Sequence, residues 1–196
     1  VDTVAQGLDS KESCRLKTDT TLAAYTQSGS GLGATLTANA NGQIADIDGF
    51  TPALNDRILV DNDGTATAAD RGIYTLTQLG DGSNPWILTR ATDFDGTPSN
   101  EVSSGAYTFI EEGTAASGNG YVLTTPNPIT IDTTGLSFTQ FSGVGQLVAG
   151  DALTKVGNTL DVNTDGTTIE VSGDQLRIAA GAAGVGLSGG GAGGAL

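Results

Sequence analysis

Residues 72–90 read GIYTLTQLGDGSNPWILTR and carry the clearest secondary-structure signal in the chain. The two ends of this stretch, 72–77 and 86–90, are short, apolar and rich in β-branched and aromatic side chains, which is typical of strands. Between them lies Asp81-Gly82, a pair that supplies the positive φ angle of a tight turn. The stretch therefore predicts two antiparallel strands joined by a turn.

The same pattern extends over the first 142 residues. Further strand-like segments lie at 34–37, 57–60, 105–110, 121–124, 128–131 and 136–141. Further Asn-Gly and Asp-Gly pairs begin at Asn41, Asp48, Asp63, Asp95 and Asn119. Residues 1–27 predict an irregular lead-in with one short strand. Short strands at this spacing predict one compact antiparallel β-sandwich or small barrel over residues 1–142.

The composition changes after Ser142, because every Tyr, Phe and Trp residue lies before it. Strand-like pieces continue at 159–162, 167–171 and 175–178, and a weak repeat relates 153–160 to 187–196. The last 18 residues contain eight Gly, six Ala and no charged side chain. A flexible linker would have this composition. The repeat favours a close-packed thread in an intertwined homotrimer, so we expect residues 143–196 to form a Gly-rich, repetitive β shaft.

The charge balance excludes a conventional nucleic-acid binder. The chain has 8 Lys and Arg against 22 Asp and Glu, a net charge of −14, whereas phosphate contacts need clustered cations. Large apolar side chains are scarce, so we expect neighbouring chains to supply part of the apolar contact. No apolar run approaches the roughly 20 residues of a membrane span, and no signal-peptide pattern is present. The chain starts at Val1 and lacks Met, so we expect it to be part of a longer polypeptide.

Catalytic residues are not evident. The chain has no histidine to serve as the base of a serine or cysteine hydrolase, and Cys14, the only cysteine, is expected to be a buried apolar residue. Glu111 and Glu112 are adjacent and would point to opposite faces of a strand. Asp93 and Asp95 lie in a turn context that favours solvated turn-capping roles. We therefore expect no enzymatic activity.

The sequence also assigns no cofactor-binding or metal-ligating residue. Asp61, Asp63 and Gly64 resemble the start of a calcium loop, but position 72 is Gly where the bidentate Glu would stand. With 17 aspartates, calcium at a loop or on a trimer axis stays open. The segment 29–34, GSGLGA, fits only a loose dinucleotide fingerprint without a surrounding βαβ unit, which favours a loop.

Aromatic side chains offer a possible platform for stacking against sugars. The candidates are Trp86, Tyr74, Tyr107 and Tyr121. Each lies inside a strand pattern, where an aromatic side chain is more often part of the core.

Seven segments, taken in order, resemble a β module that recurs in the virion appendage proteins of tailed bacteriophages. They are GATLTANANG at 33–42, NDRILV at 55–60, GIYT at 72–75, WILTRATDFD at 86–95, FIEEGT at 109–114, LSFTQFSG at 136–143 and LTKVGNTLDV at 153–162. The resemblance implies a non-enzymatic β domain joined to a repetitive shaft in a homotrimer located on the virion. It supplies no catalytic motif.

The leading hypothesis is a structural component of a phage tail fibre or tail tip that contributes to virion assembly and host attachment. Its expected partners are further copies of itself, other tail or baseplate proteins, and a glycan or protein receptor on the host surface. Three alternatives stay open: a head fibre or capsid decoration protein, a carbohydrate-binding adhesin module, and a polysaccharide depolymerase.

Overall fold

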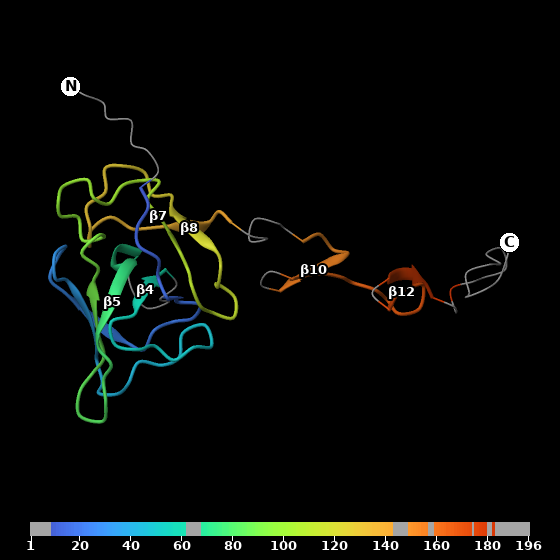
Figure 1. Cartoon of the computed structure of the whole chain (residues 1–196), viewed down its shortest axis with the longest axis horizontal. Coiled ribbons are helices and arrows are strands. Elements are labelled where there is room, and N and C mark those ends of the chain that lie inside the picture. Colours follow the sequence, from blue (N-terminus) through green and yellow to red (C-terminus); the bar gives the residue numbers. More distant parts are fainter. Residues whose placement is uncertain are drawn as a thin grey trace, which may run out of the picture. The chain divides into compact units, whose positions relative to one another are not determined.

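A computed structural model gives the arrangement of the chain (Figure 1), and it describes residues 9–61, 68–142, 149–156, 159–173, 175–179 and 182. The chain divides into two compact units, Val1–Gln146 (unit 1) and Leu147–Leu196 (unit 2). Within the described residues the one helix is the short 3-10 turn η1 (Ala68–Asp70), and none is long and apolar enough to cross a membrane. The described chain is therefore all-β, as the sequence predicts.

Unit 1 contains a six-stranded sheet with the strand order β1-β4-β5-β6-β3-β2. Its strands are β1 (Leu16–Lys17), β2 (Tyr25–Ser28), β3 (Thr35–Ala38), β4 (Arg57–Val60), β5 (Gly72–Gln78) and β6 (Ile87–Arg90). The pair β5 and β6 is the hairpin predicted from residues 72–90. All pairs are antiparallel except β1 with β4, which run parallel.

A second, antiparallel sheet of unit 1 has the order β7-β8-β9. Its strands are β7 (Tyr107–Phe109), β8 (Gly120–Leu123) and β9 (Phe138–Gln140). The N-terminal segment connects it to the first sheet, because Lys11 and Cys14 donate backbone hydrogen bonds to Tyr107 and Phe109 of β7 before the chain continues into β1. The bridges of Ser10 and Cys14 to this sheet are parallel, so the N-terminal segment differs from the predicted, wholly antiparallel arrangement.

Strands β4 and β5 of the six-stranded sheet are buried on both faces, whereas β3 and β6 bury only every second residue. Residues of β4 and β5 reach two separate apolar clusters, because successive side chains of a strand point to opposite faces. Leu59 and Ile73 pack with Leu123 of the second sheet in one cluster, whereas Leu88 and Trp86 lie in the other. The two sheets thus enclose the first cluster as a β-sandwich does, and no closed barrel forms within the described residues.

Three local expectations for unit 1 are wrong. Residues 128–131 form no strand: Pro128 lacks an N–H, and the carbonyl of Thr130 accepts hydrogen bonds from Thr133 and Thr134 in a turn. Asn119-Gly120 is not a turn, because Gly120 begins β8. The sequence also predicts one strand before residue 28, where the structure has β1 and β2.

Unit 2 contains two separate two-stranded hairpins. The first pairs β10 (Leu153–Val156) with β11 (Thr159–Val162), and the second pairs β12 (Ile169–Ser172) with β13 (Gln175–Ile178). Their sequences align without a gap, as LTKVGNTLDV at 153–162 and IEVSGDQLRI at 169–178. The described part of unit 2 is therefore a hairpin repeat, which the sequence analysis did not detect. The Gly/Ala-rich residues 180–196, apart from Ala182, lie outside the described part of the chain.

Candidate functional site

The acidic pairs weighed as catalytic candidates have separate partners. Glu112 forms an ion pair with Arg15 at 2.8 Å, whereas Glu111 accepts a hydrogen bond from Ser13. Asp93 pairs with Arg57 at 2.9 Å, and Asp95 accepts the Thr97 backbone N–H at 2.8 Å. Neither pair presents two carboxylates to one reacting group.

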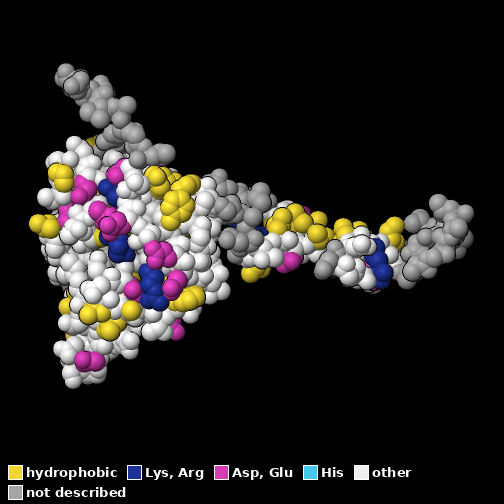
Figure 2. Space-filling view, viewed as in Figure 1, with side chains coloured by type: hydrophobic (Ala, Val, Ile, Leu, Met, Phe, Trp, Pro, Cys, Tyr) yellow, Lys and Arg dark blue, Asp and Glu magenta, His cyan; other side chains and the backbone are white. Residues whose placement is uncertain are grey.

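Ion pairs of this kind dominate one face of unit 1. Figure 2 shows Lys and Arg side chains in dark blue with Asp and Glu side chains in magenta beside them. Arg15 contacts both Asp56 and Glu112, and hydrogen bonds to these two carboxylates raise its pKa above the usual arginine value. The cations here are neutralised by neighbouring acids, so this face offers no basic patch.

Cys14 is a buried thiol. Its side chain is fully buried, and burial raises its pKa to about 11, while a hydrogen bond from Thr108 opposes the shift. A thiol with so high a pKa carries almost no thiolate near neutral pH, and the thiolate is the reactive form. Cys14 therefore serves packing.

The weak metal signal at residues 61–64 finds no support in the described chain. Asp61 forms an ion pair with Lys17 at 3.2 Å, and Asp63 and Gly64 lie outside the described residues. No group of three or more Cys, Asp or Glu side chains that could hold a metal occurs among the described residues.

The aromatic candidates fall into two sets. Trp86 and Tyr74 are 2% and 0% exposed, so neither ring can stack against a ligand. Tyr121 is half-buried, and the ammonium group of Lys17 lies 5.0 Å from its ring centroid. Tyr107 is different, because it belongs to a partly exposed aromatic cluster on the outer face of the second sheet.

This aromatic cluster consists of Tyr107, Phe109 and Phe141. The ring of Phe141 lies edge-on to both others, with centroid separations of 5.7 Å, and Phe109 and Phe141 are 46% and 42% exposed. Gly120 beneath them makes the arrangement possible, because a Cβ there would lie 2.6 Å from the Phe141 ring. With Val122 the three rings line an apolar hollow of about 380 Å³.

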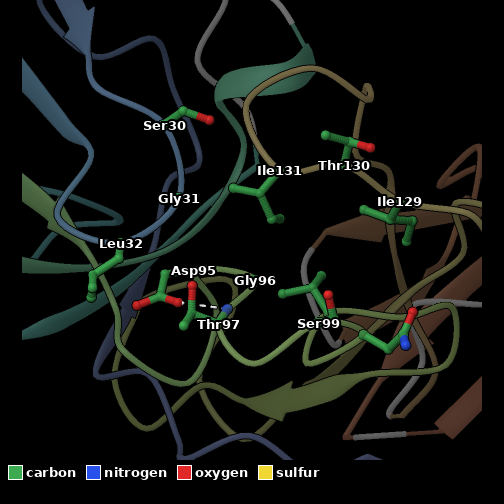
Figure 3. Close-up of a pocket in the computed structure, with 12 residues that line it drawn as sticks. Ser30, Gly31, Leu32, Asp95, Gly96, Thr97, Ser99, Ile129, Thr130 and Ile131 are labelled. Carbon is green, nitrogen blue, oxygen red and sulfur yellow. Dashed lines mark hydrogen bonds between the residues drawn. The ribbon is translucent and has the colours of Figure 1, made fainter.

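A more polar pocket of about 420 Å³ lies between three loops of unit 1 (Figure 3). The loops come from residues 30–32, between β2 and β3; residues 95–102, after β6; and residues 129–131, before β9. The segment 29–34 is thus a turn between two antiparallel strands and no dinucleotide site. Of the residues considered from the sequence, only Asp95 among the acidic candidates reaches this pocket.

A buried ion pair holds two of these loops together. The guanidinium of Arg90, on β6, contacts the carboxylate of Asp132, and these side chains are 0% and 5% exposed. The other oxygen of Asp132 accepts the Gly31 N–H at 2.7 Å. Arg90 also lies 4.6 Å from the centroid of the Tyr74 ring. The sequence does not reveal the pair of Arg90 and Asp132, because a pattern of strands and turns does not show which charged residues, distant in sequence, become partners.

The two hairpins of unit 2 present a third kind of surface. Ile169, Val171, Leu176 and Ile178 form one face of the second hairpin, because Ile169 pairs with Ile178 and Val171 with Leu176. They are 45–58% exposed. The opposite face carries Glu170 and Arg177, which form an ion pair at 2.6 Å. Figure 2 shows the hydrophobic side chains of the hairpins in yellow.

The first hairpin repeats this arrangement in part. Leu153 pairs with Val162, and Lys155 with Leu160, so three apolar side chains share one of its faces. Leu160 and Val162 are 40% and 44% exposed. Each hairpin of unit 2 thus leaves apolar side chains open to solvent.

Comparisons of the chain with protein-family models, with curated proteins and with solved structures found no match.

Proposed function

We propose that this chain is a structural component of a phage tail fibre or tail tip, in which unit 2 associates with copies of itself and unit 1 is carried as a β domain. The observation that carries the proposal is the apolar face of the second hairpin, Ile169, Val171, Leu176 and Ile178. The order of sequence segments that resembles virion appendage proteins supports the same assignment. On this proposal the chain is not an enzyme.

The energetics of an isolated hairpin favour association. A single two-stranded hairpin is marginally stable in water, and further strands or a packing partner are needed for independent stability. Each half-exposed Val, Leu or Ile side chain gains on the order of 1 kcal/mol when its remaining surface is buried. A repeat of such hairpins gives every copy the same apolar stripe, and identical stripes in neighbouring chains cover one another.

The proposed homotrimer gives this association a mechanical role. Several chains would form a β shaft from unit 2 and present several copies of unit 1, which raises overall affinity for a host surface through multivalency. The net charge of −14 would limit nonspecific adsorption to anionic surfaces. Other tail or baseplate proteins would hold the opposite end of such a fibre.

The test is the solution mass of the full chain beside a chain that ends at Ser142, measured by light scattering at two concentrations with and without EDTA. We expect the full chain at three times its 19.6 kDa mass and the shortened chain as a monomer. Two monomers would contradict the fibre proposal. A trimer that is present without EDTA and lost with EDTA would show that a bound divalent cation stabilises it.

A further inference from the structure

We propose that the pocket formed by residues 30–32, 95–102 and 129–131 binds a neutral saccharide, and that the Asp95 carboxylate accepts hydrogen bonds from its hydroxyl groups. The inference concerns unit 1 alone. It holds or fails independently of whether unit 2 forms a trimer.

Asp95 is held in place by its own loop. Its backbone N–H and that of Gly96 donate to one carboxylate oxygen of Glu101, at 3.0 and 2.9 Å. The Oδ1 atom of Asp95 accepts the Thr97 N–H at 2.8 Å, as the dashed line in Figure 3 shows. The carboxylate is therefore oriented before any ligand arrives, which lowers the cost of binding.

The second oxygen of this carboxylate is available to a ligand. Asp95 is only 3% exposed, yet within the described residues its Oδ2 atom accepts no hydrogen bond. The enclosed polar atoms without a partner among the described residues are Arg71 Nε and Arg90 Nε, so Asp95 Oδ2 is reached by solvent. Because Asp95 lines the pocket, a hydroxyl group of a bound sugar can donate to this oxygen in place of water.

The rest of the lining matches the two kinds of surface on a sugar ring. Sugars present hydroxyl groups at their edges and C–H groups on their faces. Hydroxyl or amide side chains line the pocket at Ser30, Thr97, Ser99, Asn100 and Thr130. Apolar side chains line it at Leu32, Val102, Ile129 and Ile131. The volume of about 420 Å³ lies within the range of small-ligand sites.

Charge selects a neutral ligand. Among the described residues no Lys or Arg lines the pocket, and the nearby Arg90 is committed to Asp132. An anionic ligand would therefore meet the Asp95 carboxylate without a compensating cation. A hard cation such as Ca²⁺ takes six to eight oxygen ligands and prefers several carboxylates, whereas this pocket offers one.

A buried ion pair outside the pocket holds two of its loops in place. Asp132 joins Arg90 to the backbone of Gly31, so one buried ion pair positions both the 30–32 loop and the loop that follows Ile131. Asn100 and Asp132 adopt left-handed φ angles of 69° and 62°, which Asn and Asp tolerate better than most residues. These contacts shape the pocket in the absence of a ligand.

The experiment uses saturation-transfer NMR on the full chain with D-glucose, D-galactose, D-mannose and N-acetyl-D-glucosamine, each at about 10 mM, followed by titration and a glycan array. We expect millimolar binding of at least one of them. Asp95→Asn keeps an oxygen for the Thr97 N–H but turns the free acceptor into a donor, so affinity should fall at least tenfold. Asn100→Gly keeps the left-handed φ angle, removes the amide and should also weaken binding.

Asp81→Asn is the matched control. Asp81 likewise accepts a backbone N–H with Oδ1, from Ser83 at 2.7 Å, and it lies outside the pocket, so binding should be unchanged. The proposal is overturned if the folded chain binds no neutral saccharide, or if Asp95→Asn and Asn100→Gly both bind as the original chain does. It is also overturned if calcium chloride alone shifts the Gly96 and Thr97 amide signals and a saccharide does not.

Discussion

The six-stranded sheet of unit 1 and the hairpins of unit 2 use similar strand sequences but bury them differently. Ile73 and Leu76 on β5 are 1% and 0% exposed, whereas Val171 on β12 and Leu176 on β13 are 58% and 56% exposed. In unit 1, other parts of the same unit cover both faces of β5, because Ile73 packs in one apolar cluster and Leu76 in the other. Strand-forming residues alone therefore do not make a core, because a second layer has to cover them.

The two units should therefore respond differently to mutation. Changes inside unit 1 should alter its free energy of unfolding without altering association. Changes on the hairpin faces should alter association without altering the unfolding of unit 1. Four variants test this contrast, in decreasing order of expected effect.

The largest effect is expected from Asp132→Asn, which leaves the fully buried Arg90 without an anionic partner. Removing one partner of a buried ion pair costs about 3 kcal/mol or more, so the midpoint of chemical denaturation should fall strongly. Asp93→Asn is the control, because the Arg57–Asp93 pair is 18% and 31% exposed and should cost below about 1 kcal/mol. Equal effects of the two substitutions would contradict the importance assigned to the buried pair.

The next effect is expected from Val171→Thr combined with Leu176→Thr in unit 2. Losing two apolar contacts per chain should weaken association at least tenfold, measured as mass against concentration by light scattering. Glu170→Gln combined with Arg177→Gln changes the opposite face of the same hairpin and should leave the mass unchanged. If unit 1 became less stable with the threonine variant, the independence of the two units would be wrong.

A smaller effect is expected from Gly120→Ala, under the aromatic cluster of unit 1. The new Cβ would lie 2.6 Å from the Phe141 ring, but this ring is 42% exposed and can swing outward. We expect a loss of about 1 kcal/mol and a changed near-ultraviolet circular dichroism spectrum. An unchanged spectrum would show that the rings are not packed on Gly120.

The smallest effect is expected at Asp165, in the turn before β12. Hydrogen bonds from the Thr168 hydroxyl, and then from the backbone N–H groups of Thr168, Ile169 and Thr167, lower the pKa of this carboxyl below the usual value for Asp. A lowered pKa in the folded state stabilises the turn at pH values above about 3.9, and this contribution is lost as the pH falls toward the folded pKa.

Titration of the Thr168 and Ile169 amide signals by NMR measures this pKa. The midpoint should lie below about 3.9, and Asp165→Asn should abolish the transition. A midpoint at the ordinary value for Asp would mean that the turn is not held by its side chain.

Much of the strand content could be predicted from sequence, because it follows from local chemistry. The two short segments rich in β-branched and aromatic side chains in residues 72–90 form β5 and β6, and Asp81-Gly82 lies between them. The prediction of a strand at residues 128–131 is wrong because its apolar, β-branched composition also occurs in turns and loops. Residues 128–131 look like a strand by composition, yet Pro128 removes a hydrogen-bond donor and Asp132 is committed to Arg90.

The pocket could not be predicted in the same way. The sequence presents Asp95 as half of an acidic pair in a turn, whereas its environment in the pocket depends on Gly31 and Ile131, which are distant in sequence. The partnership of Arg90 with Asp132 is likewise a property of the folded chain. The hairpin repeat was missed for another reason: Leu153 aligns with Ile169 and Lys155 with Val171, and such substitutions hide a repeat from a comparison of residue identities.

The N-terminal segment also determines how unit 1 would bear a pulling force. Lys11 and Cys14 donate hydrogen bonds to β7, and Arg15 and Thr18 donate to β4, all at 2.8–3.0 Å and in a parallel arrangement. Tension applied at Asp9 along this segment would load these four bonds in shear, together, instead of opening them one after another. The N-terminal segment thereby fastens both sheets of unit 1 to each other.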